Sequence, residues 1–253
     1  MNWRDDGIIL GLLKHGESAV VLEAFTHAHG RHKGYVHGGL SKAKRGVLQP
    51  GNLVALEWRG RLEGSLGNFS VEPQAAYAAG IMASPGPLAA LRSLCAMLSR
   101  ALPEHDPHPG LYEGFLNLVA DLSSLADSDP AWGEAVVHFE CHFLADIGYG
   151  LDLDSCAVTG ATEGLAFVSP KTGRAVTQIG AGDYAPRMLR LPAFLTEGGA
   201  PDWADIGLGL RLTGHFLERF FAESDGRPLP EERQRLLALV DEKTARYGGA
   251  QSP

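Results

Sequence analysis

A basic run between residues 27 and 45 holds the side chains with the clearest chemical use. It contains five Lys or Arg residues and four histidines, and it has no Asp or Glu. Clustered cations displace the counterions of a nucleic-acid backbone, so such a run is typical of sequence-independent binding to phosphates. We predict phosphate contacts from this run and from two later arginines: Arg31, Lys33, Lys42, Lys44, Arg45, Arg59 and Arg61.

Two aromatic residues, Tyr35 and Trp58, lie among these cations. An aromatic ring beside a basic groove offers a flat face on which an unpaired base stacks. Alternation with Val54 and Leu56 places Trp58 on the inner face of its strand, so Tyr35 is the predicted stacking residue. The alternative interpretation is a solvated basic surface with both rings in the core.

Histidine and cysteine spacing raises the question of a metal or catalytic site. His138 and His142 are four residues apart on a predicted helix, but a zinc protease needs Glu directly after the first His. Glu140 instead lies about 200° around the helix from His138. The chain also lacks the phosphate-binding glycine loops and the Gly-x-Ser-x-Gly elbow of serine hydrolases. We therefore predict a protein that is not an enzyme, with no catalytic residue, no cofactor and no bound metal.

Composition limits the class of protein. The chain has 253 residues, 45% of them hydrophobic, and a net charge of -8. Residues 1–80 carry nine Lys or Arg against seven Asp or Glu, whereas residues 81–253 carry thirteen against twenty-three. This asymmetry indicates a polyanion-binding end on an acidic body. Without a long apolar run or a hydrophobic signal core, and with three widely spaced cysteines, we expect a cytoplasmic protein with free thiols and no membrane partner.

The apolar pattern has a period of two before residue 80. Five β-rich segments are separated by turns that contain Gly or Pro: 7–13, 18–26, 31–37, 51–59 and 65–71. Five short strands of this kind suit an OB-type β-barrel, whose strand face and loops bind oligonucleotides.

After residue 80 the apolar residues recur at helical spacing. Helices are predicted at 85–102, 111–125, 131–147, 186–196, 202–222 and 230–246. Residues 151–185 are predicted to be irregular, with a hairpin across 169–173. The sequence therefore predicts an α+β, multidomain protein with an OB domain at 1–80 and a mainly helical domain at 81–253.

Short motifs follow one another along the chain in a definite order. They are Gly7-Ile8-Ile9-Leu10, Gly16-Glu17-Ser18, Gly34-Tyr35-Val36, Leu48-Gln49-Pro50-Gly51-Asn52, Gly148-Tyr149-Gly150-Leu151-Asp152 and Ser169-Pro170-Lys171-Thr172-Gly173. In this order and spacing they resemble the RecO family of bacterial recombination mediators.

The resemblance implies an N-terminal OB domain, a helical domain and a role in recombinational DNA repair. Members of the family bind single- and double-stranded DNA, anneal strands coated by single-strand-binding protein, and act with RecR to load RecA. These activities and partners, and association with the nucleoid during repair, are therefore expected of this chain. Two other classes stay open: a protein-interaction adaptor that works through its acidic helical half, and an RNA-binding OB protein.

Many members of the family carry a zinc module with four cysteine ligands, and this chain departs from that pattern. Cys156 stands where the first ligand is expected, and Thr159 replaces the second. No cysteine pair follows the hairpin. We predict a zinc-module-like insertion that lacks its metal ligands and is held together by packing alone.

The helical half of the family is implicated in docking the acidic, phenylalanine-ended tail of single-strand-binding protein. Such a tail needs an apolar slot with a cation for its terminal carboxylate. The alternative is that each cation of this half is solubilising or pairs with a nearby acid. The candidates are Arg92, Arg100, Arg187, Arg190, Arg211 and Arg219.

Overall fold

The computed structural model describes residues 1–61 and 66–248. The chain separates into two compact units, residues 1–127 and 128–253. The predicted change from strands to helices near residue 80 falls inside the first unit. The division into domains at 1–80 and 81–253 stays a prediction.

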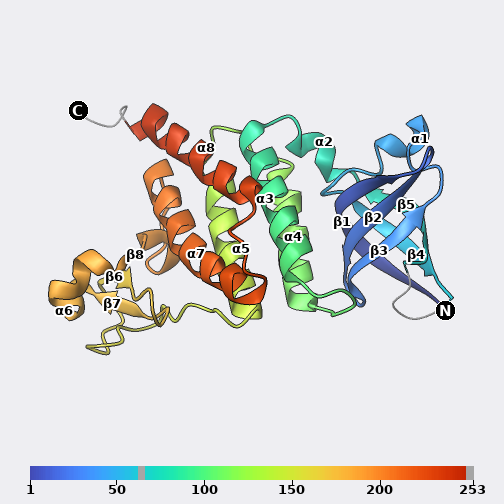
Figure 1. Cartoon of the computed structure of the whole chain (residues 1–253). Helices are drawn as coiled ribbons and strands as arrows, with labels where there is room; N and C mark the ends of the chain where they lie inside the picture. The colour runs from blue at the N-terminus through green and yellow to red at the C-terminus, as the bar shows by residue number, and fades with distance from the viewer. Residues whose placement is uncertain (62–65, 249–253) are drawn as a thin grey trace. The chain divides into compact units, whose positions relative to one another are not determined.

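Five strands form the N-terminal sheet (Figure 1): β1 (Asn2–His15), β2 (Ala19–Thr26), β3 (Gly30–Val36), β4 (Leu53–Arg59) and β5 (Asn68–Ala75). Their order, β1-β2-β3-β5-β4, closes into a barrel because β4 also pairs with β1. Neighbouring strands are antiparallel except β3 and β5, which meet in parallel at Tyr35 and Asn68. The expected five-stranded OB-type sheet is confirmed, although residues 62–65, where the fifth strand was expected to begin, lie outside the described residues.

Alternating side chains fill the barrel. Val54, Leu56 and Trp58 on β4 all point inward and are at most 2% exposed. The Trp58 indole Nε1 donates a hydrogen bond to the backbone oxygen of Leu66 at 3.3 Å. The predicted inward orientation of Trp58 is confirmed, so its ring packs in the core and does not present a face to solvent.

Two features of the barrel region differ from the predicted pattern. β1 begins at Asn2 rather than residue 7, because residues 2–8 pair with β4. Trp3 is the first apolar side chain after Met1, and polar residues follow it, so the sequence shows little β periodicity there. Two short helices were also missed: α1 (Lys42–Arg45) and α2 (Tyr77–Ile81).

Two longer helices complete the first unit: α3 (Pro85–Ala101) and α4 (Pro109–Leu122). α3 has proline at its start, as the sequence predicted, and packs against β1. The link between these helices lies along β3, where Arg31 and Glu104 form a parallel β-bridge. The backbone N–H of His105 donates to the oxygen of Arg31 at 3.0 Å, so the link adds a short extra edge to the barrel.

The second unit is built on α5 (Ala131–Asp146), α7 (Trp203–Ser224) and α8 (Glu231–Tyr247), with α7 packed against both of the others. A buried ion pair joins them. Arg233 on α8 contacts Glu140 on α5 through Nε at 2.6 Å and Nη2 at 2.9 Å. Thr213 on α7 donates to the same carboxylate. Arg233 is 1% exposed and Glu140 is 0% exposed.

A small sheet forms the insertion in this unit. Its strands are β6 (Leu165–Val168), β7 (Ala175–Thr177) and β8 (Leu189–Arg190), in the order β7-β6-β8, with α6 (Gln178–Ala181) beside them (Figure 1). The hairpin predicted across 169–173 is confirmed by β6 and β7.

The helix predicted at 186–196 is wrong. This stretch holds the end of a 3-10 turn, η1 (Gly182–Arg187), then β8, then a second 3-10 turn, η2 (Ala193–Leu195). Pro192, inside this stretch, lacks the backbone N–H that a continuous helix would need at its position. Among the helices of the described residues, none is long and apolar enough to cross a membrane.

Candidate nucleic-acid interface

The predicted cations Lys42, Lys44 and Arg45 form the single-turn helix α1, which contains no acid and no buried residue. Lys42 and Arg45 are exposed, and no described residue offers either one a carboxylate at ion-pair distance. Lys44 Nζ donates to the backbone oxygen of His37 at 2.9 Å, which ties the helix to the end of β3. Three cations that form no ion pair with a described carboxylate therefore lie together at one end of the barrel.

Tyr35 lies at the same end. It is half-buried on β3, and its ring centroid is 4.8 Å from that of His15 at the end of β1. The His37 ring Nε2 lies 2.8 Å from the Asn68 side-chain oxygen at the start of β5. The ends of β1, β3 and β5 thus place Tyr35 at the same end as the α1 cations. The sequence predicted this grouping only because these residues are close together in the basic run.

A groove about 280 Å³ in volume joins α1 to β1. Lys14 and Arg45 both line it, and no acid is among its lining residues. Lys14 was not among the predicted cations. It lies one residue before the end of β1, close to the β1–β2 turn, and loops between OB strands contact oligonucleotides. Its position beside that turn is the sequence signal that could have identified it. The apolar lining comes from Leu12, Val20, Leu40 and Leu48.

Arg31 and Lys33 are already paired. The Arg31 side chain is 10% exposed, and its guanidinium contacts Glu23, Glu104 and the backbone oxygen of Leu102. Lys33 Nζ donates to Glu104 at 2.7 Å. These two predicted cations are therefore not available to a phosphate in this conformation.

The two remaining predicted cations lie at the end of β4. Arg59 is exposed, but its guanidinium contacts Glu57 at 2.7 Å. Arg61 is exposed and has no carboxylate partner among the described residues. Four of the seven predicted cations, the three of α1 and Arg61, form no ion pair with an acid among the described residues. Only the α1 group lies near Lys14.

The outer face of β1, β4 and β5 has the opposite charge. A groove of about 420 Å³ on it is lined by a single cation, Arg4, which contacts Glu57 at 3.3 Å. The electrostatic potential therefore favours approach of a polyanion at the α1 end rather than at this face. Its acidic lining residues are Asp5, Asp6, Glu57 and Glu72.

The six arginines predicted to dock a partner's tail are distributed over several elements. Arg211 contacts Asp241 at 2.6 Å, and Arg219 contacts Glu223 at 2.8 Å, so these two already pair with local acids. Arg190 lies over the Phe167 ring at 5.4 Å.

The other three predicted arginines divide between the two units. Arg92 and Arg100 lie on α3 of the first unit, and Arg187 is exposed at the end of η1 in the second. A groove of about 720 Å³ in the second unit has Asp202 and Asp205 in its lining but none of the six arginines. Tail docking at these residues stays a prediction.

The residues around Cys156 do not fit a zinc ion. Its Sγ accepts hydrogen bonds from the backbone N–H groups of Thr159 at 3.4 Å and Thr177 at 3.3 Å. Burial alone would raise the pKa of Cys156, but hydrogen bonds from the side chains and backbone of Thr159 and Thr177 lower it to about 6. A structural zinc site needs four Cys or His ligands. Among the described residues no three His, Cys, Asp or Glu side chains gather as a metal-binding group.

A histidine pair lies beneath the link between α3 and α4. The Nδ1 atoms of His32 and His105 are 2.6 Å apart, and His32 Nε2 is buried without a hydrogen-bond partner in the described structure. Burial, with the nearby His105 and His29, lowers the pKa of His32 from 6.5 to about 4. His32 is therefore neutral in the folded protein at physiological pH.

The protein is expected to lose stability as the pH falls from about 6.5 to about 4. In this window the unfolded chain protonates His32 and the folded protein does not, so protonation favours unfolding. The urea midpoint at several pH values measures the effect. His32→Phe, which has no titrating group, should show a shallower decline, and an unchanged decline would contradict the assignment to His32.

A closed five-stranded sheet of this strand order, joined to helices and carrying a basic end, defines a protein of the OB-type class. The N-terminal part, residues 1–77, matches the family model "Recombination protein O N terminal", and residues 84–224 match "Recombination protein O C terminal". The chain belongs to the RecO family, whose role is in DNA repair and recombination.

Curated relatives support this assignment over almost the whole length. The chain is 45% identical to the DNA repair protein RecO of Cereibacter sphaeroides over 240 residues, covering 95% of this chain and 98% of the relative. It is 46% identical to that of Paracoccus denitrificans over 241 residues, covering 95% and 96%. It is 48% identical to that of a Chelativorans species over 242 residues, covering 95% and 96%.

Proposed function

We propose that the α1 end of the barrel binds the phosphate backbone of single-stranded and double-stranded DNA. The observation that carries this proposal is the gathering of Lys14, Lys42, Lys44 and Arg45 at one barrel end, where neither α1 nor the lining of the groove contains an acid. Tyr35 at the same end offers a ring for an unpaired base.

This mode of binding suits strand annealing. Cations that hold phosphates do not use the pairing edges of the bases, so a bound strand can still meet its complement. The chain then acts without a covalent step, as a mediator rather than an enzyme. RecR, the tail of single-strand-binding protein and, indirectly, RecA are the partners that family membership supports for this function.

Replacing Lys42, Lys44 and Arg45 together with Ala should flatten the dependence of log K on log salt by about two units, since each phosphate neutralised on a single strand contributes about 0.7. The measurement is fluorescence anisotropy of a labelled oligo-dT strand at several salt concentrations. Affinity should fall for any base sequence, because phosphates carry the contacts.

A matched control removes three positive charges elsewhere. Arg227, Arg235 and Arg246 are exposed residues of the second unit, and their triple Ala variant has the same net charge as the α1 variant. It should keep the parent slope. Equal slopes for the α1 variant and the parent would mean that the α1 end is not the DNA site.

A further inference from the structure

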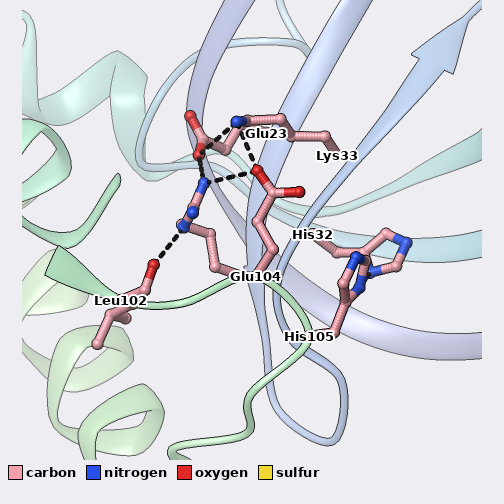
Figure 2. Close-up of polar contacts among 7 residues, drawn as sticks. Glu23, His32, Lys33, Leu102, Glu104 and His105 are labelled. Atoms are coloured by element: carbon pink, nitrogen blue, oxygen red, sulfur yellow. Dashed lines mark hydrogen bonds and ion pairs between the residues drawn. The ribbon is translucent and has the colours of Figure 1, made fainter. Parts of the chain in front are cut away.

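The cations of β3 that the α1 surface does not use form a charge-balanced cluster with two acids. Glu104, from the link between α3 and α4, receives hydrogen bonds from Lys33 at 2.7 Å and Arg31 at 3.2 Å. Glu23 on the neighbouring strand also contacts Arg31. Figure 2 shows the Glu104 carboxylate beside the Lys33 ammonium, with Glu23 on the other side. Two carboxylates thus balance two cations.

Glu104 is the member of the cluster that can leave most easily. Its side chain is 37% exposed and that of Lys33 is 36% exposed, whereas those of Arg31 and Glu23 are 10% and 17% exposed. Rotation of the Glu104 side chain into solvent would therefore uncover Lys33 without moving the strand. Removal of its carboxylate would leave the cluster with one net positive charge.

The link that carries Glu104 is held in a strained conformation. His105 has φ +66°, and it is the only residue other than glycine with positive φ in the described structure. Such a conformation disfavours residues with a Cβ atom. The positive φ of His105 opposes the closed position of the link, so a competing ligand for the cations has less to overcome.

A carboxylate and a phosphate oxygen are alternative partners for the same ammonium and guanidinium groups. The geometry of this cluster points to a second phosphate-binding site, made by Lys33 and Arg31 on β3 and covered by Glu104, which a DNA phosphate displaces. This inference rests on the proposed binding of DNA by the barrel. Lys33 lies two residues before Tyr35 on the same face of β3, so a strand held at the α1 end can extend along β3 to this site.

Intramolecular occupation multiplies the apparent affinity of a site by the fraction of time that the site is uncovered. Glu104→Gln keeps the size of the side chain and removes its charge. It is expected to raise affinity for oligo-dT about fivefold at 0.1 M salt and to steepen the salt slope by about 0.7, the value for one further phosphate contact. Anisotropy titrations at several salt concentrations measure both quantities.

Two further variants isolate the cause. Lys33→Ala alone should change affinity little, because Lys33 is neutralised in the parent protein. Lys33→Ala combined with Glu104→Gln should lose the gain, because no cation is then uncovered. Glu163→Gln, which removes one exposed carboxylate from the second unit, is the control for net charge and should leave the slope unchanged. Circular dichroism melting confirms that each variant is folded.

The outcomes separate this inference from the proposed function. If Glu104→Gln leaves affinity and slope unchanged while the α1 triple variant flattens the slope, the covered site does not exist and the DNA-binding end stands. If neither variant has an effect, both proposals are wrong. If the double variant keeps the full gain, the gain does not come from Lys33, and the inference is overturned.

Discussion

Replacing Arg233 with Met is expected to lower the free energy of unfolding of the second unit by about 3–5 kcal/mol. The substitution leaves Glu140 charged and completely buried without its main partner. It also leaves the backbone oxygen of Leu210, which accepts from Arg233 Nη2 at 2.6 Å, without that donor. Urea denaturation followed by far-ultraviolet circular dichroism measures the loss.

The companion variant tests whether the unpaired charge is the cause. Glu140→Leu combined with Arg233→Met removes both charges and fills the space with apolar groups. Buried ion pairs replaced in this way often lose little or no stability. We expect the double variant to recover most of the loss, and a double variant as unstable as Arg233→Met would show that packing, not charge, dominates.

Replacing Gly30 with Ala is expected to destabilise the first unit by about 3 kcal/mol. Gly30 has φ +65°, and a Cβ atom there would lie 2.0 Å from the backbone oxygen of Asp106. The link between α3 and α4 must then move away from β3. If Glu104 covers a phosphate site, the same variant should also bind oligo-dT more tightly.

Gly38 provides a matched control for the backbone conformation. Its φ is +64°, and no heavy atom outside its immediate chain neighbours lies within 4 Å of the position that a Cβ atom would take. Gly38→Ala should therefore lose only the conformational part, about 1 kcal/mol. Equal losses for the two variants, measured by urea denaturation, would contradict a steric role for the link at Gly30.

The barrel was predictable because its signals are local. Period-two alternation with turns between the strands indicated five strands, and the position of Trp58 between inward residues indicated its burial. The prediction for 186–196 failed because the apolar residues there suggested a helix while Pro192 interrupted the hydrogen bonds.

The candidate site was predicted only in part, because whether a cation has a carboxylate partner depends on residues distant in sequence. Lys42 and Lys44 stay without acids, as their surroundings in the sequence indicated. Lys33 lies in the same basic run, yet its partner Glu104 is 71 residues away. No periodicity or motif in either segment indicates that they meet, so composition alone overcounted the available cations.

The bridge between Arg31 and Glu104 has a consequence for synthesis of the chain. β3 and β5 meet through one registered pair, at Tyr35 and Asn68, and the link that follows α3 pairs with β3 at Arg31. A nascent chain that has emerged only through β5 therefore displays an unpaired strand edge, a surface prone to wrong pairing. This part of the β3 edge gains its partner only when the ribosome has delivered α3 and the link. Wrong pairing along β3 is accordingly expected to be most frequent before that point.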